Sequence, residues 1–307
     1  MNVVMQIQNL TSTYNLMNGL KFSFKKDVYT PYTTMTATFS YLCITNPKRI
    51  RLTIDGVMVH EGIIEHYQYE KNADGQTIKL KSKGYTSLLT QNEATPGLYS
   101  NITFNQLMET FLTIPNITHE NNSSNSSYVY IEKNTDIWQA IASYCYKVFG
   151  RYPYISGTNT VTVTQKANPI SFTKTTNEAY GWGMEYDYTN LLSHLHMADI
   201  NGTYNTYNTA DSSATQRNIY RHKHYDLDEQ FLDNPATALQ YKLKYSRRAT
   251  QNAYCIYKGY DGEDLNDLFT LTGDGLISNK RISAIEINGD SNNIMTKISA
   301  YQDSFNI

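Results

Sequence analysis

The sequence has few charged residues and no excess of either sign. Only 18% of its 307 residues are charged, with 26 Lys and Arg against 28 Asp and Glu, so the formal net charge is −2. Nucleic-acid-binding proteins owe much of their affinity to clustered Lys and Arg that neutralise phosphates. The balance argues against specific nucleic-acid binding, and the short basic clusters 221–224 and 242–248 are interpreted as solvated faces.

Cysteines and long apolar runs are also scarce. The three cysteines, Cys43, Cys145 and Cys255, are odd in number and widely separated, so neither a disulfide framework nor a cysteine metal site is expected. This usage fits folding in a reducing cytoplasm. The N-terminus lacks the features of a signal peptide, and no apolar run is long enough to span a bilayer. We expect a soluble chain without membrane insertion.

Tyrosine, in contrast, is abundant, with 27 copies against 10 Phe and 2 Trp. Tyrosine and threonine favour the half-buried positions of β-strands, so the composition indicates a mainly β protein. Tyrosine is also enriched at protein interfaces, because its ring buries area while its hydroxyl still finds a hydrogen-bond partner. Both interpretations, strand filling and interface formation, remain open from composition.

Residues 1–100 have the alternating pattern of strands and are predicted to form a first β-barrel domain. Asp55-Gly56 lies between two alternating runs and predicts a tight hairpin turn. A second turn at 72–75 is predicted between a third and a fourth strand, with Gly75 at the strained position. Alternation also predicts inward-facing side chains at Phe22, Phe24, Met35, Ala37 and Phe39.

Residues 101–168 are predicted to form a small α/β domain. Thr103 to Gln106 has capping-box form, and Phe104, Leu107, Met108 and Phe111 follow at helical spacing. A second helix is predicted to start at Thr135 and to stop at Gly150, with an apolar face that includes Trp138 and Ile141. A closing hairpin is expected around Ser156-Gly157.

Residues 169–307 return to the β pattern and are predicted to form a second β-barrel domain. A helix is inserted near 235–252, with Asn234 as its cap and Pro235 in the first turn. Asn288-Gly289 is expected to form a turn before the last strand. The predicted fold is therefore mainly β, with two tail-tube-like barrel domains bracketing a small helix-plus-hairpin domain.

Two histidine pairs are the features that most resemble metal ligands. They are His194 with His196, and His222 with His224. Residues i and i+2 of a strand point to one face, so each pair could grip a metal ion. No third ligand follows at a standard spacing, and the second pair lies in a basic cluster. The sequence therefore predicts no metal site.

Paired carboxylates for acid–base chemistry could come from Asp226, Asp228 and Glu229. These residues precede a helix, where acidic side chains are favoured by the helix dipole in any case. The sequence contains none of the common hydrolase, metalloprotease or phosphate-loop motifs. Gly181-Trp182-Gly183 is interpreted as a strand bend. We expect no catalytic residue, no cofactor and no enzymatic activity.

Residues 54–99, IDGVMVHEGIIEHYQYEKNADGQTIKLKSKGYTSLLTQNEATPGLY, resemble the first domain of a known family. The family is that of the baseplate hub proteins of contractile phage tails, the late-control gene D family, with the hubs of Mu-like phages and phage-tail-like bacteriocins. Its G-x-I strand and later Leu-Leu pair correspond to Gly62-Ile63-Ile64 and Leu88-Leu89. The usual Arg of its last strand is absent, and Lys81 or Lys83 stands there.

The resemblance continues along the chain. Residues 129–165 look like the helix and hairpin of the family's second domain, with Trp138 in the helix. Residues 217–262 are similar to its arginine-containing strand and following helix, and residues 267–288 to its closing strands. The matching segments cover about two-thirds of the chain and occur in the family's order.

The resemblance implies a structural role. Hubs of this family form homotrimers whose two barrel domains build a pseudo-sixfold ring between the hexameric tail tube and the trimeric central spike, beside the baseplate wedge proteins. Tape-measure protein and DNA pass through the ring, and a near-neutral chain suits that passage. The implied location is the bacterial cytoplasm during assembly and then the baseplate of a phage or a phage-tail-like bacteriocin.

Two other functions remain open from the residues. A β-rich adhesin or carbohydrate-binding module would share the composition, with exposed tyrosines as its contacts. It would not predict the central helix-plus-hairpin segment or the helix near residue 235. A cell-wall hydrolase is the third option, but the sequence leaves no room for a lytic segment after the last β region.

Overall fold

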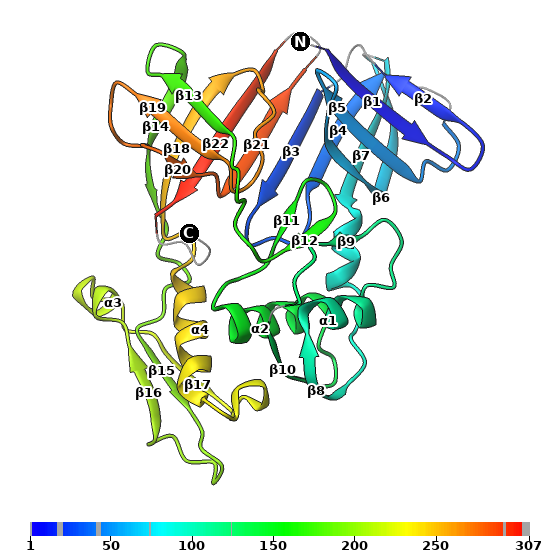
Figure 1. Ribbon diagram of the computed structural model, residues 1–307. Helices are drawn as coiled ribbons and strands as arrows, with labels where there is room; N and C mark the ends of the chain where they lie inside the picture. Colours follow the sequence, from blue (N-terminus) through cyan, green and yellow to red (C-terminus); the bar gives the residue numbers. More distant parts are fainter. Residues whose placement is uncertain are drawn as a thin grey trace.

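The computed structural model describes residues 2–16, 21–40, 44–73, 75–123, 125–290 and 293–302. The predicted mainly β class is confirmed (Figure 1). One sheet of eleven strands dominates, and each strand is antiparallel to its neighbours. Its strands, in spatial order, are β14 (Ala179–Tyr186), β18 (Gln251–Lys258), β22 (Ile294–Tyr301), β21 (Ala284–Gly289), β3 (Lys21–Asp27), β4 (Thr34–Ser40), β7 (Gly75–Gly84), β6 (Val57–Asn72), β5 (Arg49–Ile54), β1 (Val3–Gln8) and β2 (Thr13–Leu16).

The long sheet joins the two ends of the chain. β3 pairs directly with β21, so that Phe24 lies opposite Ile287 and Phe22 opposite Gly289. The sheet ends at β2 and β14, and no sheet of the described residues closes into a barrel. The two closed barrels expected from the sequence are not found there, because each half of the sheet pairs with the other half instead of closing on itself.

A single hydrophobic core lies against both halves of this sheet. Ile7 and Leu80 come from the N-terminal strands, and Cys255 and Ile298 from the C-terminal ones. Burying one such aliphatic side chain contributes about 1.5–3 kcal/mol, so the shared core couples the stability of the two halves. The residues that alternation predicts to face inward are all buried: Phe22, Phe24, Met35, Ala37 and Phe39.

The hairpin predicted at Asp55-Gly56 is confirmed, with φ of 46° and 84° at these two residues. The prediction of a separate third strand is wrong. Residues 57–72 form one strand, β6, that bends at two bulges. β6 and β7 then pair as expected, with Tyr67 opposite Leu80, although Asp74 of the turn lies outside the described residues. Gly62 allows the close crossing, because a Cβ atom there would lie 2.1 Å from the carbonyl oxygen of Lys83.

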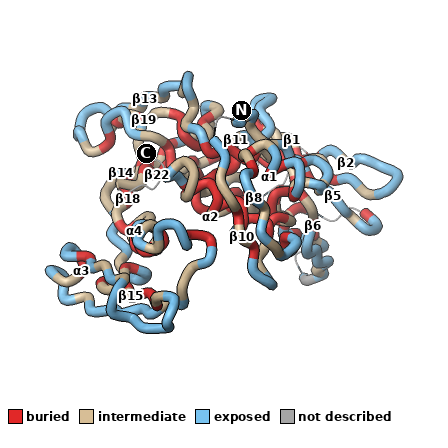
Figure 2. The backbone as a smooth tube through the Cα atoms, turned by 60° about the horizontal axis from the view of Figure 1, so that its bottom comes forward, coloured by how far each residue is buried: buried red, intermediate tan, exposed pale blue. Residues whose placement is uncertain are grey.

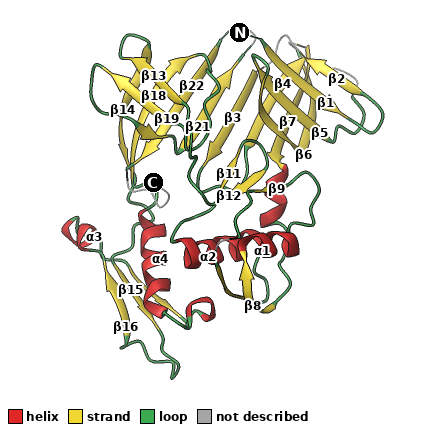
Figure 3. Ribbon diagram, in the orientation of Figure 1, coloured by secondary structure: helices red, strands yellow, loops and turns green. Residues whose placement is uncertain are grey.

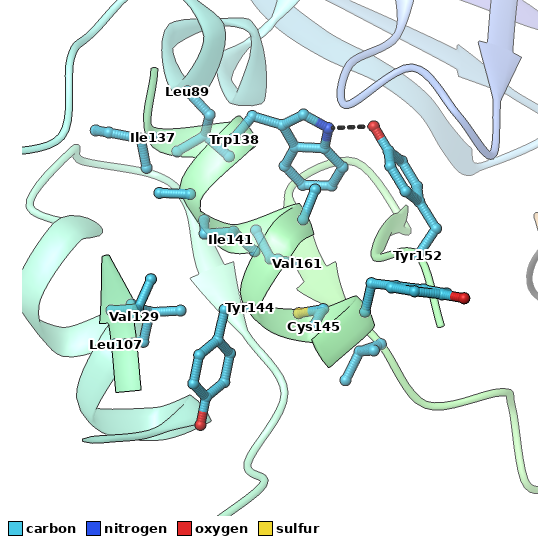
Figure 4. Packing of buried hydrophobic residues seen from close by; sticks show 14 of the residues in the cluster. Leu89, Leu107, Val129, Ile137, Trp138, Ile141, Tyr144, Cys145, Tyr152 and Val161 are labelled. Atoms are coloured by element: carbon cyan, nitrogen blue, oxygen red, sulfur yellow. Dashed lines mark hydrogen bonds between the residues drawn. The ribbon is translucent and has the colours of Figure 1, made fainter. Parts of the chain in front are cut away.

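The helices of the middle segment also form where the sequence places them. α1 (Phe104–Phe111) begins with the predicted capping box between Thr103 and Gln106. α2 (Ile137–Phe149) is capped by Asp136, one residue later than predicted, and ends at Gly150 with φ 66°. Figure 4 shows the apolar face of α2, where Trp138 Nε1 donates a hydrogen bond to the hydroxyl of Tyr152 at 3.1 Å.

Short sheets accompany these helices. β8 (Gly97–Thr103) pairs with β10 (Ser126–Ile131), and β9 (Thr118–His119) joins the hairpin of β11 (Tyr154–Ser156) and β12 (Thr160–Thr162). The predicted turn at Gly157 connects β11 to β12. A 3-10 helix, Tyr85–Thr90, leads out of β7. In the view of Figure 3, the helices α1, α2 and α4 (Pro235–Arg247) lie below the strands of the long sheet.

Residues 187–250 form a lobe beside α2, and most of its surface is exposed or only partly buried (Figure 2). A sheet of β16 (Tyr207–Ala210), β15 (His194–Met197) and β17 (His222–Tyr225) packs against α4 (Pro235–Arg247). α3 (Ser212–Gln216) and a 3-10 helix, Glu229–Phe231, complete the lobe. α4 ends five residues earlier than predicted, and Asn234 stands at its N-cap position without a side-chain capping hydrogen bond.

The remaining sheet, β13 (Ser171–Thr175), β19 (Leu268–Thr272) and β20 (Lys280–Arg281), covers the C-terminal half of the long sheet. Asn288 and Gly289 belong to β21 instead of the predicted turn. Cys145 and Cys255 are free and buried, and Cys43 lies outside the described residues. In the described part of the chain, no helix is both long and apolar enough to cross a membrane.

Candidate assembly surface and predicted site residues

Two long edges of the sheet lack a neighbouring strand among the described residues. β14 pairs only with β18. In β6, residues 57–63 pair with β5 on one side, whereas residues 65–72 pair only with β7. Unpaired N–H and C=O groups along such edges can accept a strand from another chain. We call β14 and residues 65–72 of β6 the candidate assembly surface.

β14 combines exposed aromatic side chains with small residues. Tyr180 is 70% exposed and Tyr186 56%, and Trp182 lies between them. The register with β18 shifts between Ala179 and Gly181, just before the bend predicted at Gly181-Trp182-Gly183, and these three residues pair regularly with β18. The indole of Trp182 donates a hydrogen bond to Asp274 at 2.5 Å, which fixes the ring. Large exposed aromatic side chains are enriched where proteins associate.

The half of β6 that pairs only with β7 is exposed on both faces. Residues 65–69 are all exposed, and the rings of Tyr67 and Tyr69 pack edge to face with centroids 5.6 Å apart. The hydroxyl of Tyr69 donates a hydrogen bond to the carbonyl oxygen of Ile44. These tyrosines do not fill a core, so at this edge the interface interpretation of the tyrosine content is favoured over strand filling.

A buried ionic cluster fixes β3 to the middle and C-terminal segments. Lys26 is 5% exposed, and its Nζ donates to Asp264 and, at 2.5 Å, to the carbonyl oxygen of Gly157. Lys166 pairs with Asp267 at 3.0 Å. Burial alone would raise the pKa of the Asp264 carboxyl, but the charges of Lys26 and Lys166 outweigh it and lower that pKa. Sequence reasoning missed this cluster because its members are far apart in the chain.

The structure brings the two histidine pairs together. β15 and β17 are parallel and in register, with His194 beside His222 and His196 beside His224. The rings stack in the order 194, 222, 196, 224, with successive centroids 4.2, 5.6 and 4.6 Å apart. Within the described ranges, no group of three or more His, Cys, Asp and Glu side chains is arranged to hold a metal ion.

The three candidate carboxylates do not form a site. Asp228 accepts a hydrogen bond from the backbone of Gln230, as the cap of the 3-10 helix, and pairs with Lys242 at 3.0 Å. Glu229 bonds the hydroxyl of Tyr130 and raises its pKa. Asp226 is exposed. Asp228 and Glu229 have separate structural partners, which agrees with the helix-start interpretation and gives no pair aimed at one substrate atom.

The basic clusters are not simply solvated faces. Arg221 donates from one guanidinium nitrogen to the carbonyl oxygens of Tyr188, Thr189 and Leu191. Arg247 Nε lies 2.5 Å from a carboxylate oxygen of buried Asp211. Residues 221–224 are nevertheless all exposed, as expected of a solvated face, whereas Arg247 is only partly exposed and pairs with a buried carboxylate.

A groove of about 540 Å³ lies where the lobe meets the long sheet. Asp27 lines it and accepts hydrogen bonds from the backbone N–H of Tyr29 and the hydroxyl of Tyr301. Burial raises the pKa of the Asp27 carboxyl, against the lowering effects of these bonds and of Arg248. The Asp27 carboxylate is thus held by partners of its own chain.

Several solved structures share this architecture. A 43 kDa tail protein of prophage MuSo2 from Shewanella oneidensis superimposes with a TM-score of 0.73 and 13% sequence identity, over 100% of both chains. A tail protein from Neisseria meningitidis MC58 gives 0.70 and 14%, over 98% of this chain and 96% of that one. The chain has the fold of phage tail proteins.

A third structure extends the comparison beyond phages. The Escherichia coli c3393 protein, a component of the type VI secretion system with structural similarity to the T4 tail proteins gp27 and gp5, gives a TM-score of 0.58 at 12% identity. The match covers 96% of this chain and 76% of that one. No family model and no curated protein matches the sequence significantly. The fold agrees with the tail-protein part of the family resemblance.

Proposed function

We propose that this protein is the structural hub of a contractile-tail baseplate, joining the hexameric tail tube to the trimeric central spike as a homotrimer. The single observation that supports this best is the long sheet, in which strands from both ends of the chain are joined side by side through β3 and β21. Two fused sheet halves per chain would give six halves in a trimer, which matches a sixfold tube to a threefold spike.

In this proposal the barrels expected from the sequence form between copies. The free edge of β14 in one copy pairs with residues 65–72 of β6 in the next, and three such contacts close a ring. The exposed aromatic residues of both edges become buried at these contacts. The domain boundaries 1–100, 101–168 and 169–307 belong to the same proposal, as do the tail tube, spike, wedge and tape-measure partners and the baseplate location.

The test is the solution mass of the purified chain at tens of micromolar. A trimer has a mass of 3 × 35.1, or 105.3 kDa. We expect Tyr180→Lys to reduce the trimer fraction strongly, because a buried ammonium group at the contact would be unpaired. Ile200→Lys is the matched control, since Ile200 is 89% exposed in the lobe, away from both edges.

The same experiment separates the hub from the adhesin. A strict monomer at every concentration would favour an adhesin with exposed tyrosines as glycan contacts, and in that case Tyr180→Lys would change glycan binding without changing mass. If Ile200→Lys and Tyr180→Lys reduce the trimer fraction equally, the β14 edge is rejected as the contact between copies.

A further inference from the structure

We propose that His196 and His222 form a binding site for a divalent transition-metal ion of the nickel, copper and zinc group. This inference is independent of the proposed hub function. Imidazole nitrogen is a preferred ligand of these ions, and the face holds four imidazoles from two adjacent strands.

The backbone presents all four rings on one side of the lobe sheet. Leu195 and Met197 are fully buried, so the alternating residues of β15 point to the opposite, more exposed face. β17 is the parallel neighbour in register, and its histidines stack with those of β15. An i, i+2 pair that the sequence shows twice is therefore a four-histidine face in the structure.

Two of the ring nitrogens already lie at the spacing that a shared metal requires. Nε2 of His196 is 3.3 Å from Nδ1 of His222. Two imidazole nitrogens bound tetrahedrally to one zinc ion at about 2.0–2.1 Å lie about 3.3–3.4 Å apart. His222 would carry its hydrogen on Nε2, so that Nδ1 of His222 and Nε2 of His196 both present lone pairs to the ion, and water would complete the coordination. This two-ligand site differs from the sites of three or more ligands that the described residues lack.

Asn208 fixes the tautomer of the first ligand. Its side-chain nitrogen donates to the carbonyl oxygen of Asn205 at 3.1 Å, so its Oδ1 faces Nδ1 of His196 at 2.6 Å. The Oδ1 atom can only accept, which places the hydrogen on Nδ1 and the lone pair on Nε2. Metal-ligating histidines characteristically donate their second ring N–H to such an acceptor. Asn208 is thus a positioning residue for His196.

The test is calorimetric titration of the full chain with Ni²⁺ and with Zn²⁺. We expect one ion per chain, a loss of affinity of tenfold or more in His196→Gln and in His222→Gln, and about tenfold in Asn208→Ala. His194→Gln and His224→Gln are expected to change the affinity less than threefold. His119→Gln is the control, since His119 lies on β9, outside this face and outside the candidate assembly surface.

A second readout checks that the variants remain folded and that binding is structural. The ion bridges β15 and β17, so saturating Ni²⁺ raises the melting temperature of the wild type and of His119→Gln but not of His196→Gln. Absence of binding at millimolar Ni²⁺ and Zn²⁺ would overturn the proposal. Equal affinity in His119→Gln and His222→Gln would overturn it too, and equal losses of affinity in the variants of all four histidines of the face would reject the assigned pair.

Discussion

His60 is a fully buried histidine with a hydrogen bond at each ring nitrogen. Nδ1 lies 2.7 Å from the hydroxyl oxygen of Thr33, and Nε2 lies 2.8 Å from that of Ser82. Burial lowers the pKa of His60 from 6.5 to about 3. Below pH 6.5 the unfolded chain therefore takes up a proton that the folded chain does not.

The folded pKa is below the unfolded one, so the stability supported by neutral His60 is complete above pH 6.5 and is lost as the pH falls toward 3. We expect the free energy of unfolding to decrease by about 1.4 kcal/mol per pH unit from this residue within that window. Urea unfolding from pH 7 to pH 5 measures the slope, and His60→Gln is expected to flatten it. An unchanged slope in that variant would contradict the assignment.

Asp211 is a second buried titratable group with defined partners. Burial would raise its pKa, but hydrogen bonds from Arg247 and Ser213 and the charge of Arg247 lower it to about 2. The carboxylate also caps α3 through the backbone N–H groups of Ser213 and Ala214.

We expect Asp211→Ala to reduce the free energy of unfolding by about 3 kcal/mol, because it leaves Arg247 without its buried partner and removes the cap. Asp211→Asn retains a cap acceptor and is expected to lose about half as much. Denaturant unfolding at pH 7 measures both. Equal losses of unfolding free energy in the two variants would show that the charge of Asp211, and not its cap hydrogen bonds, stabilises the protein.

At the scale of elements, Gly62 permits the close crossing of β6 and β7. The Cβ of an alanine there would meet the backbone carbonyl of Lys83 at 2.1 Å, and backbone cannot rotate away. We expect Gly62→Ala to destabilise the protein by about 3 kcal/mol in denaturant unfolding. Gly181→Ala is the matched strand control, because its Cβ would have only Ile256 at 4.0 Å. Equal stability of the two variants would refute the steric explanation.

Local signals predicted elements well, and long-range pairings could not be predicted. α1 follows from the capping box at Thr103, and the turn at Asp55-Gly56 from its own two residues. The sequence predicts two strands within residues 57–72, because the bulges of β6 shift the phase of the alternation and one strand then has the pattern of two. The histidine face depends on the pairing of β15 with β17. No repeat in the sequence indicates that residues 194–197 pair with residues 222–225.

At the scale of the whole molecule, Lys26 connects three distant segments. It lies on the buried face of β3 and bonds the β11–β12 turn and Asp264. We expect Lys26→Met to cost about 3–5 kcal/mol, since Asp264 loses one of its two lysine partners. Lys25→Met is the neighbouring control. Lys25 is 61% exposed and lies 3.4 Å from Glu286, so its loss is expected to cost less than about 1 kcal/mol. Thermal unfolding compares the two variants. Similar losses of stability in Lys26→Met and Lys25→Met would show that the buried ionic cluster does not hold the three segments together.

The candidate assembly surface was only partly visible in the sequence. The tyrosine content indicated interfaces or strands without separating them, and the family resemblance implied a trimer. Which edge is free depends on where β5 stops along β6, at residue 63, and on the absence of a strand beyond β14 in the described residues. Both are properties of the assembled sheet.

The pairing of β3 with β21 also has a consequence for synthesis on the ribosome. β3 is complete after residue 27, yet its partner spans Ala284–Gly289 and is made only after the long intervening stretch of chain. At about 5–20 residues per second, the nascent chain waits on the order of 10–50 s with that edge unpaired. The N-terminal strands therefore complete their core only after β21 has been made, and until then the exposed edge of β3 is open to association with another chain.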